Sequence, residues 1–390
     1  MKNLNVKNII TETLTILTTV FPLCISMAAC TGINAYIGIA ASVFAAIFLK
    51  IKSDKEIMPV IISFLCFAYT TSAYGHGAAA FSVMICGILL VITTFTGLDV
   101  KALIFKPAIT AIMQAAAITV TVLYTTDYFG IGATGNTIDE MLASYTSLGF
   151  HPNWRGVLYG TIVMVIMITL PRKFKKGEKV FRATSAALII TLILNLFLNP
   201  ADKVSAINEI GTLNFTIDEI IFPVRNYVPN ASSFFSVLIS GVAMYSSATY
   251  SLNTEKEASS KDYLLSGSMN VAASLLGFFI PGKIRKRKDF TPATVIAAII
   301  IIVFAVLCKD LIARIPVHSC AVILIVASWQ SMKWGYYKTA FNDVASITCL
   351  LSVLAFSLLF GFTKGMIFAT VFSAVYSIIT INSKPKQHLN

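Results

Sequence analysis

The stretch FFIPGKIRKRKDF, residues 278–290, places five cations within the six positions from Lys283 to Lys288. An apolar run ends just before them at Pro281, and a second one, TPATVIAAIIIIVFAVL, begins at Thr291. Lys and Arg collect in the short cytoplasmic loops of membrane proteins. Charge of this density between two apolar runs therefore indicates a chain that is embedded in a bilayer, and raises the question of what the cations do there.

The composition supports this interpretation. Hydrophobic residues make up 56% of the chain, charged residues 12%, and the mean hydropathy is +0.79. We expect one all-α polytopic bundle over residues 1–390, because about thirteen apolar stretches each approach the length that crosses ~30 Å of hydrocarbon. The stretches are 9–30, 34–50, 57–74, 77–96, 102–124, 156–171, 182–199, 233–250, 263–280, 291–308, 316–332, 344–361 and 365–381.

The net charge of +12 is explained by loop bias rather than by nucleic-acid binding. The loop PRKFKKGEKVFR, residues 171–182, holds six cations and one Glu, whereas segment 125–155 carries Asp127, Asp139 and Glu140. The positive-inside bias predicts that 171–182 is cytoplasmic and 125–155 external. The N-terminus then lies in the cytoplasm.

Several motifs are better explained by a structural role than by cofactor binding or catalysis. GIGATG, residues 130–135, fits a dinucleotide pattern that needs a strand before it; we expect a flexible loop that continues into the polar loop NTIDEMLASYTS, residues 136–147. The seven cysteines form no CxxC pair and are expected to be small hydrophobes. His76 and His318 are expected to be interfacial histidines with satisfied hydrogen bonds. No catalytic constellation, metal cluster or cofactor motif is found, so we predict a protein that is not an enzyme.

The apolar spans contain few carboxylates, and none lies between Glu219 and Glu255. Cation-driven transporters usually keep one near the midplane, so the sequence argues against cation coupling. Hydroxyl groups are dense instead, as in SSFFSVLISGVAMYSSATYS, residues 232–251. They either pack helices together or line a path for a small solute.

Short elements along residues 5–380 resemble the sulfate permease (SulP) family of anion transporters, in order and spacing. They are Pro22 with Gly32-Ile33 and Gly38, Phe105-Lys106-Pro107-Ala108, Asn153-Trp154 with Leu170-Pro171-Arg172, INEIG at 207–211, KDYLLSGSMNVAASLLGFFIP at 261–281 and DLIARIPVHSCAVILIVASW at 310–329.

The resemblance implies 13–14 transmembrane segments in two inverted repeats of seven, 1–199 and 200–390, that form a core and a gate domain. The third and tenth segments would be discontinuous, with half-helix N-termini that present amides to an anion at the midplane. A homodimer through the gate segments is also implied. The anion-binding residues would be Pro22, Cys24, Ser26, Met58, Pro59, Val60, Tyr245, Ser246, Ser247, Gly282, Lys283 and Arg285.

The chain also departs from the family pattern. Gly241 or Met244 replaces a Glu of the eighth segment, and Gly361 replaces an Asp. Thr291 lies only ten positions after Pro281, and we expect a membrane domain without a STAS domain. The basic block is then a cytoplasmic anchor after a shortened tenth segment, an external loop of a thirteen-helix protein, or a direct anion ligand.

We therefore expect a bacterial inner-membrane transporter of a small inorganic anion, of the bicarbonate or sulfate type, that works by alternating access. The alternative is a degenerate relative that no longer transports and acts as a scaffold or sensor.

Overall fold

The computed structural model describes residues 6–31, 35–49, 57–96, 106–133, 135, 137–173, 179–198, 223–253, 258–279, 291–330, 332 and 343–383. The first half of this part contains α1 (Val6–Thr31), α2 (Ala35–Phe48), α3 (Ile57–Tyr74), α4 (His76–Thr96), α5 (Lys106–Phe129), α6 (Ile138–Leu148), α7 (Trp154–Lys173) and α8 (Lys179–Leu198). The second half contains the 3₁₀-helix η3 (Pro223–Asn226), α11 (Ala231–Leu252), α12 (Ser260–Leu275), α13 (Pro292–Leu307), α14 (Lys309–Ala313), α15 (Val317–Gln330), α17 (Val344–Phe360) and α18 (Phe362–Ser383).

The thirteen apolar stretches each coincide with a helix, which confirms the all-α polytopic prediction. Within the described ranges, four helices have both the length and the hydropathy to cross a membrane, namely Ile9–Thr31, His76–Thr96, Pro107–Phe129 and Ala231–Leu252, and eight further apolar helices are shorter. The predicted tenth segment falls within residues 280–290, which lie outside the described part.

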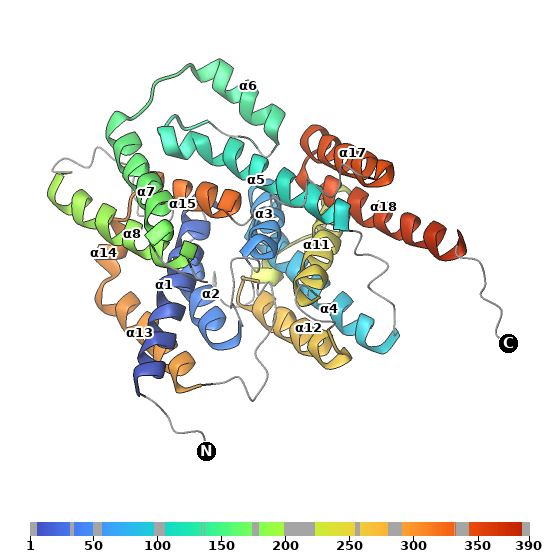
Figure 1. Ribbon diagram of the computed structural model, residues 1–390, viewed down its shortest axis with the longest axis horizontal. Coiled ribbons are helices and arrows are strands. Elements are labelled where there is room, and N and C mark those ends of the chain that lie inside the picture. Colours follow the sequence, from blue (N-terminus) through green and yellow to red (C-terminus); the bar gives the residue numbers. More distant parts are fainter. Residues whose placement is uncertain are drawn as a thin grey trace.

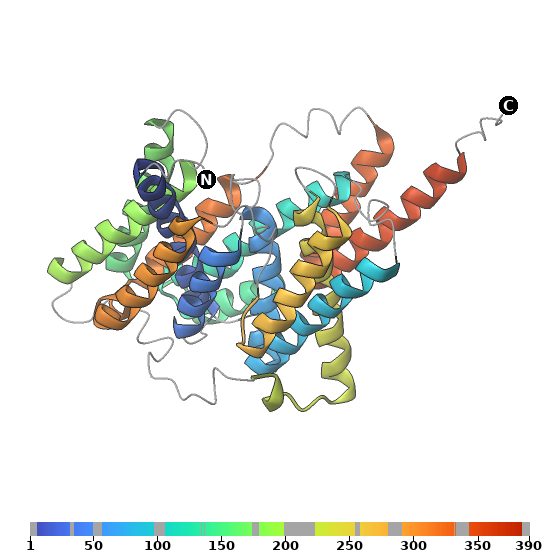
Figure 2. The ribbon, with the colours of Figure 1, turned by 90° about the horizontal axis from the view of Figure 1, so that it is seen from below.

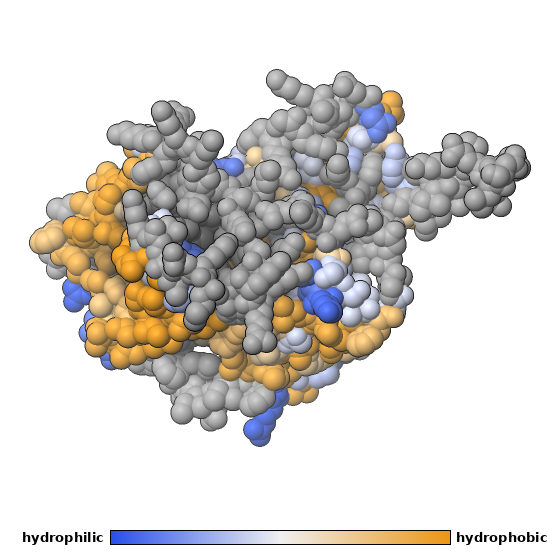
Figure 3. Space-filling view, turned by 60° about the horizontal axis from the view of Figure 1, so that its bottom comes forward, coloured by the Kyte–Doolittle hydropathy of each residue, from blue (hydrophilic) through white to orange (hydrophobic). Residues whose placement is uncertain are grey.

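The surface of the molecule is suited to lipid. Large apolar side chains stand exposed along α7, α8, α13 and α17, for example Leu158, Ile193, Val306 and Leu351, and hydrophobic residues cover broad areas of the face in Figure 3. Contiguous apolar surface of this extent marks a membrane contact in a protein of this composition.

We divide the helices into two groups, each built from both halves of the chain. In the first group α3 and α4 pack with α11 and α12, α1 and α2 pack with α13, and α1 joins these two sets through a small contact with α3. The most extensive contact of this group is between α4 and α12. The second group combines α5–α8 with α15, α17 and α18. In both ribbon views α7 and α8 lie at one end and α17 and α18 at the other, with α3 between them (Figures 1 and 2). Helix α1 also contacts α8 and α15, and α11 contacts α18, so these helices join the two groups.

The segment between α5 and α7 differs from the prediction. The polar loop expected at 136–147 is mostly the helix α6, so that prediction was wrong. The hydroxyl of Thr137 caps the helix by accepting from the N–H of Glu140, and Asp139 and Glu140 occupy the first turn. Acidic residues there interact favourably with the positive end of the helix.

Helix α5 extends beyond the apolar stretch 102–124, as far as Phe129, and includes Asp127. GIGATG begins just after it. Gly130 and Gly132 have φ values of 66° and 71°, a conformation that glycine adopts readily. The N–H of Ala133 donates to the hydroxyl of Thr126 over 2.9 Å. Because the motif follows a helix and not a strand, its rejection as a dinucleotide site is confirmed.

Candidate functional site

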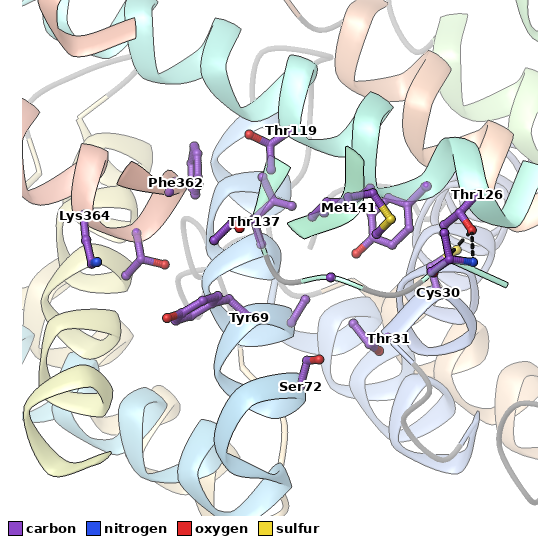
Figure 4. A pocket seen from close by; sticks show the side chains of 18 of the residues that line it. Cys30, Thr31, Tyr69, Ser72, Thr119, Thr126, Thr137, Met141, Phe362 and Lys364 are labelled. Carbon is purple, nitrogen blue, oxygen red and sulfur yellow. Dashed lines mark hydrogen bonds between the residues drawn. The ribbon is translucent and has the colours of Figure 1, made fainter. Parts of the chain in front are cut away.

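A cavity of about 340 Å³ lies between the two helix groups. Residues of α1, α3 and α11 line it from the first group, and residues of α5, α6, α17 and α18 line it from the second. We call it the interface cavity. Figure 4 shows Tyr69 and Ser72 on one side and Thr119, Phe362 and Lys364 on the others. A cavity bounded by both groups changes shape whenever the groups move relative to each other.

Hydroxyl groups supply much of the polar lining of the interface cavity. Thr31, Ser72, Thr119, Thr126 and Thr137 all contribute. The Thr119 side chain is 5% exposed, and its hydroxyl has no hydrogen-bond partner in the described part of the chain. A buried polar group without a partner is costly unless something else binds it. The cavity therefore offers unsatisfied hydrogen-bonding capacity to a solute.

Two charged side chains line the interface cavity, Asp127 on α5 and Lys364 on α18. In Figure 4 Lys364 lies on one side of the cavity and Thr126, the chain neighbour of Asp127, on the other. Asp127 is partly buried and Lys364 is exposed. Sequence reasoning missed Asp127 because it assigned it to a loop. Its spacing from Thr119 and Leu123 at helical intervals of four residues was the available signal, since such positions share one face.

Helix α6 covers part of the cavity, through Thr137 and the buried Met141. Nearby on the same helix, burial and the negative charge of Asp127 raise the pKa of Tyr145 to about 12. Tyr145 is therefore a neutral phenol at physiological pH and supplies no charge to this region.

A second cavity, of about 60 Å³, brings together two of the predicted anion-binding residues, Cys24 on α1 and Val60 on α3. Its other walls are largely aromatic and aliphatic, including Phe64, Phe67, Phe278 and Phe279. The ring centroids of Phe67 and Phe279 are 5.3 Å apart. The described part of this site is thus apolar.

The predicted residues of α11 turn toward three different neighbours. The Tyr245 hydroxyl lies 2.8 Å from that of Thr93 on α4. Ser247 accepts from Ser63 on α3, and Ser246 accepts from Thr370 on α18, each over 3.0 Å. Ser246 and Ser247 also line a cavity of about 30 Å³ against α5 and α18. They do not share a cavity with Cys24 and Val60.

The remaining predicted anion-binding residues are buried or lie outside the described part of the chain. Pro22 and Ser26 are buried within α1, and the Ser26 hydroxyl has no partner in the described part. Helix α3 begins at Ile57, which places Pro59 in its first turn, but the side chains of Met58 and Pro59 are outside the described part. Gly282, Lys283 and Arg285 fall in the undescribed residues 280–290. The roles of these residues, and the interpretations of the basic block, stay predictions.

His76 and His318 differ from the prediction that their hydrogen bonds are satisfied. The ring of His318 is 1% exposed, and neither of its nitrogens, nor those of His76, has a hydrogen-bond partner among the described residues. The prediction of satisfied histidines was wrong because the ring of His318 packs against the backbone of two glycines. A Cβ on Gly156 would overlap the ring, and one on Gly130 would lie 2.8 Å from Nε2.

No protein-family profile and no curated protein sequence matches this chain. Its architecture is nevertheless defined by solved structures: the chain has the fold of the transmembrane domains of SLC26/SulP transporters, which confirms the resemblance found in the sequence at the level of the fold.

The transmembrane domain of a cyanobacterium bicarbonate transporter, BicA, superposes over 97% of this chain and 98% of its own, with a TM-score of 0.66 and 16% identity. SLC26A9 aligns over 97% of this chain with a TM-score of 0.71 and 12% identity, and 66% of its length is covered. The murine Slc26a9 anion transporter in its inward-facing state gives a TM-score of 0.71, 11% identity and 69% coverage of its length.

Proposed function

We propose that this chain is a multi-pass protein of a bacterial inner membrane that moves a small inorganic anion, of the bicarbonate or sulfate type, by alternating access. The interface cavity is the observation that carries the proposal, because its lining includes several hydroxyl groups and two charged side chains, it is large enough for an ion with several waters, and it is walled by both helix groups. The fold neighbours, which include a bicarbonate transporter and an anion transporter, support it.

The orientation follows from the loop charges. With the N-terminus in the cytoplasm, the C-terminal ends of α1, α3 and α5 and the whole of α6 face the outside. Cys30, Ser72 and Asp127 lie at these ends, so the interface cavity opens to the exterior. On this orientation we infer an outward-facing state of the transport cycle.

The moving parts would be the two helix groups, with α1–α4 and α11–α13 as the core and α5–α8 with α15–α18 as the gate. This order, repeated along the chain, is what two inverted repeats at 1–199 and 200–390 would produce. The hydrogen bond from Thr370 to Ser246 joins gate to core. An interhelical hydrogen bond of this type contributes only about 0.6 kcal/mol on average, so it can break and re-form during a cycle.

The test is uptake of radiolabelled bicarbonate, sulfate and chloride into proteoliposomes. We expect saturable uptake of at least one of them. Ala68→Trp should suppress it, since Ala68 lies on the cavity wall. Ile190→Trp is the matched control because Ile190 is exposed on the apolar surface of α8. Traces no higher than those of empty vesicles for all three anions would reject the proposal.

The alternative is a degenerate relative that does not transport and acts as a scaffold or sensor. The apolar second cavity favours it, because a ring of phenylalanines near the start of α3 offers an anion few hydrogen bonds. In that case uptake would be absent, and anions would leave the melting temperature of the protein unchanged or would raise it without flux. Saturable uptake would exclude this alternative.

A further inference from the structure

Helix α6 has an apolar side that extends beyond the part that protein covers. Thr137 and Met141 line the interface cavity, and the Met141 side chain is buried. Successive residues of an α-helix are about 100° apart around its axis, so Leu142 flanks this buried side, whereas Asp139 and Ala143 lie opposite it and are exposed. The Leu142 side chain is 51% exposed as well, although water is an unfavourable environment for a leucine.

Further exposed apolar side chains follow α6 and lead into α7. Phe150 is 59% exposed, and Trp154, the first residue of α7, is 68% exposed. Leu158, about one turn further along α7, belongs to the exposed apolar surface that is suited to lipid. Phe150 and Trp154 therefore extend the lipid-facing surface of α7 toward α6.

Two contacts fix the position of this extension relative to the spans. The ring centroids of Phe150 and Phe129 are 5.2 Å apart, and the N–H of Asn153 donates to the carbonyl oxygen of Phe129 over 2.8 Å. Phe129 is the last residue of α5, and Trp154 is the first of α7. Phe150 thus lies at the level where one span ends and the next begins, which is the boundary between hydrocarbon and headgroups.

The residue types suit that boundary. Tryptophan is enriched at headgroup level, because its ring is apolar and its N–H is polar. Arg155 follows Trp154 and is exposed, and a long cationic side chain at the end of a span reaches the headgroups while its stem stays on apolar surface. A helix with an apolar side and a charged side lies in the plane of the interface. Figure 1 shows α6 at the edge of the molecule, where it contacts α5 and α17.

We propose that α6 and the segment joining it to α7 form a lipid-binding surface, with Leu142, Phe150 and Trp154 inserted among the headgroups and upper acyl chains of the leaflet at which α5 ends. The adjoining side of α6 covers the interface cavity through Thr137 and Met141. The bilayer therefore holds the cover of the cavity in place. The cover bears on transport only if the proposed function holds, whereas lipid binding does not depend on it.

The first test measures the lipid contact of Trp154 by fluorescence in proteoliposomes. Brominated phosphatidylcholine quenches tryptophans that contact lipid, and acrylamide quenches those that contact water. The difference between wild type and Trp154→Phe isolates Trp154, since both proteins contain the other two tryptophans. We expect brominated lipid to quench this difference signal strongly and acrylamide to quench it weakly. A signal quenched by acrylamide alone, or by neither reagent as at a protein-covered site, would overturn the inference.

The second test examines α6 itself. Leu142→Trp and Ala143→Trp are compared in the Trp154→Phe background. Ala143 is the matched control because it is an exposed neighbour on the same helix but lies opposite the buried side. Brominated lipid should quench the added emission of Leu142→Trp several-fold more than that of Ala143→Trp, and acrylamide should give the reverse order. Equal quenching of the two variants by each reagent would show that α6 has no lipid-facing side, and the proposal would fail.

The third test concerns the cover of the cavity. Leu142→Gln together with Phe150→Gln removes apolar contact without adding charge. Cys30 lines the cavity, so in a background without the other two partly buried cysteines it should react with a small thiol reagent several-fold faster in this double variant than in Ala143→Gln. An unchanged rate would contradict the role of lipid in holding the cover.

None of these measurements requires transport, so the two proposals can fail separately. If brominated lipid quenches as expected while no anion is taken up, the lipid-binding surface stands and the transport proposal fails. If anions are taken up but brominated lipid quenches neither Trp154 nor the tryptophan of Leu142→Trp, the surface is rejected and transport stands.

Discussion

Gly87 of α4 and Gly267 of α12 face each other across the most extensive helix contact of the described chain. A Cβ on Gly87 would lie 2.7 Å from the carbonyl oxygen of Gly267, and a Cβ on Gly267 would lie 2.7 Å from that of Gly87. The two backbones approach each other so closely only because neither residue has a side chain. Small residues at helix crossings are the usual means of tight packing in membranes, where lipid removes the hydrophobic drive between helices.

We predict that Gly267→Ala lowers the free energy of unfolding by about 1–3 kcal/mol, the usual cost of overpacking a well-packed site. The clash is with backbone, which cannot rotate away. Thermal unfolding in detergent measures the effect. Ser268→Ala is the control because its side chain is exposed on the same helix. Equal melting temperatures for the two variants would contradict the close approach.

A second prediction concerns the hydroxyl pairs that join α3 to α11. Thr70 lies 2.7 Å from Ser240, and Ser63 lies 3.0 Å from Ser247, in each case between hydroxyl oxygens. A double-mutant cycle with Thr70→Val and Ser240→Ala should give a coupling energy of about 0.6 kcal/mol, the average for interhelical hydrogen bonds in membranes. Additive effects of the two changes on unfolding would show that the pair contributes nothing.

The cysteines give a test of the interface cavity and of orientation. Cys30 lines the cavity and is partly buried, whereas Cys66, Cys86, Cys320 and Cys349 are buried. Cys24 and Cys308 are also partly buried, so the test uses a Cys24→Ser, Cys308→Ser background. In that background a small membrane-impermeant thiol reagent added to intact cells should modify Cys30 before the four buried cysteines. The signal should disappear when Cys30→Ser is added, and a transported anion should slow the reaction. Labelling only after the cells are opened would place the cavity on the cytoplasmic side.

We predict that the stability of the fold depends on pH through Asp343, at the N-terminus of α17. The carboxylate of Asp343 accepts from the hydroxyl of Ser346 over 2.6 Å and from the N–H groups of Ser346 and Ala345. These donors lower the pKa of Asp343. The group therefore stabilises the fold above the ordinary carboxyl pKa, and this contribution is lost as the pH falls through the lowered folded value.

The measurement is the melting temperature from neutral to acidic pH for wild type and Asp343→Asn. Asn is also a good N-cap but does not titrate, so we expect the difference between the two to narrow as the pH falls through the lowered range. Curves that stay parallel over the whole range would contradict this role for Asp343.

The positions of the thirteen main helices followed from hydropathy because a membrane span needs a long apolar run, and length and composition are properties of the sequence alone. The ordered resemblance of short elements was enough to identify the fold. The polar composition of residues 136–147 led to the wrong prediction of a loop where α6 forms. The spacing of Thr137 and Glu140 is a local capping signal, but it was outweighed by the general expectation that polar segments between spans are loops.

The candidate site was less accessible to sequence reasoning. Whether Ser246 and Ser247 face a solute or a neighbouring helix depends on how α11 is rotated, and hydroxyls spread around a helix do not fix that rotation. The position of Asp127 could not be obtained from charge counts, since these treat all acids between two spans as equivalent. Packing of α1, α5 and α15 is what places it beside the cavity.

The interface cavity also has a pharmacological consequence. Its walls belong to Tyr69 and Ser72 of one helix group and to Thr119 and Phe362 of the other, so a compound that fills it would act as a wedge between two bodies. Such an inhibitor would act whichever ion is transported. It would also hold the protein in one conformation, which would help structure determination.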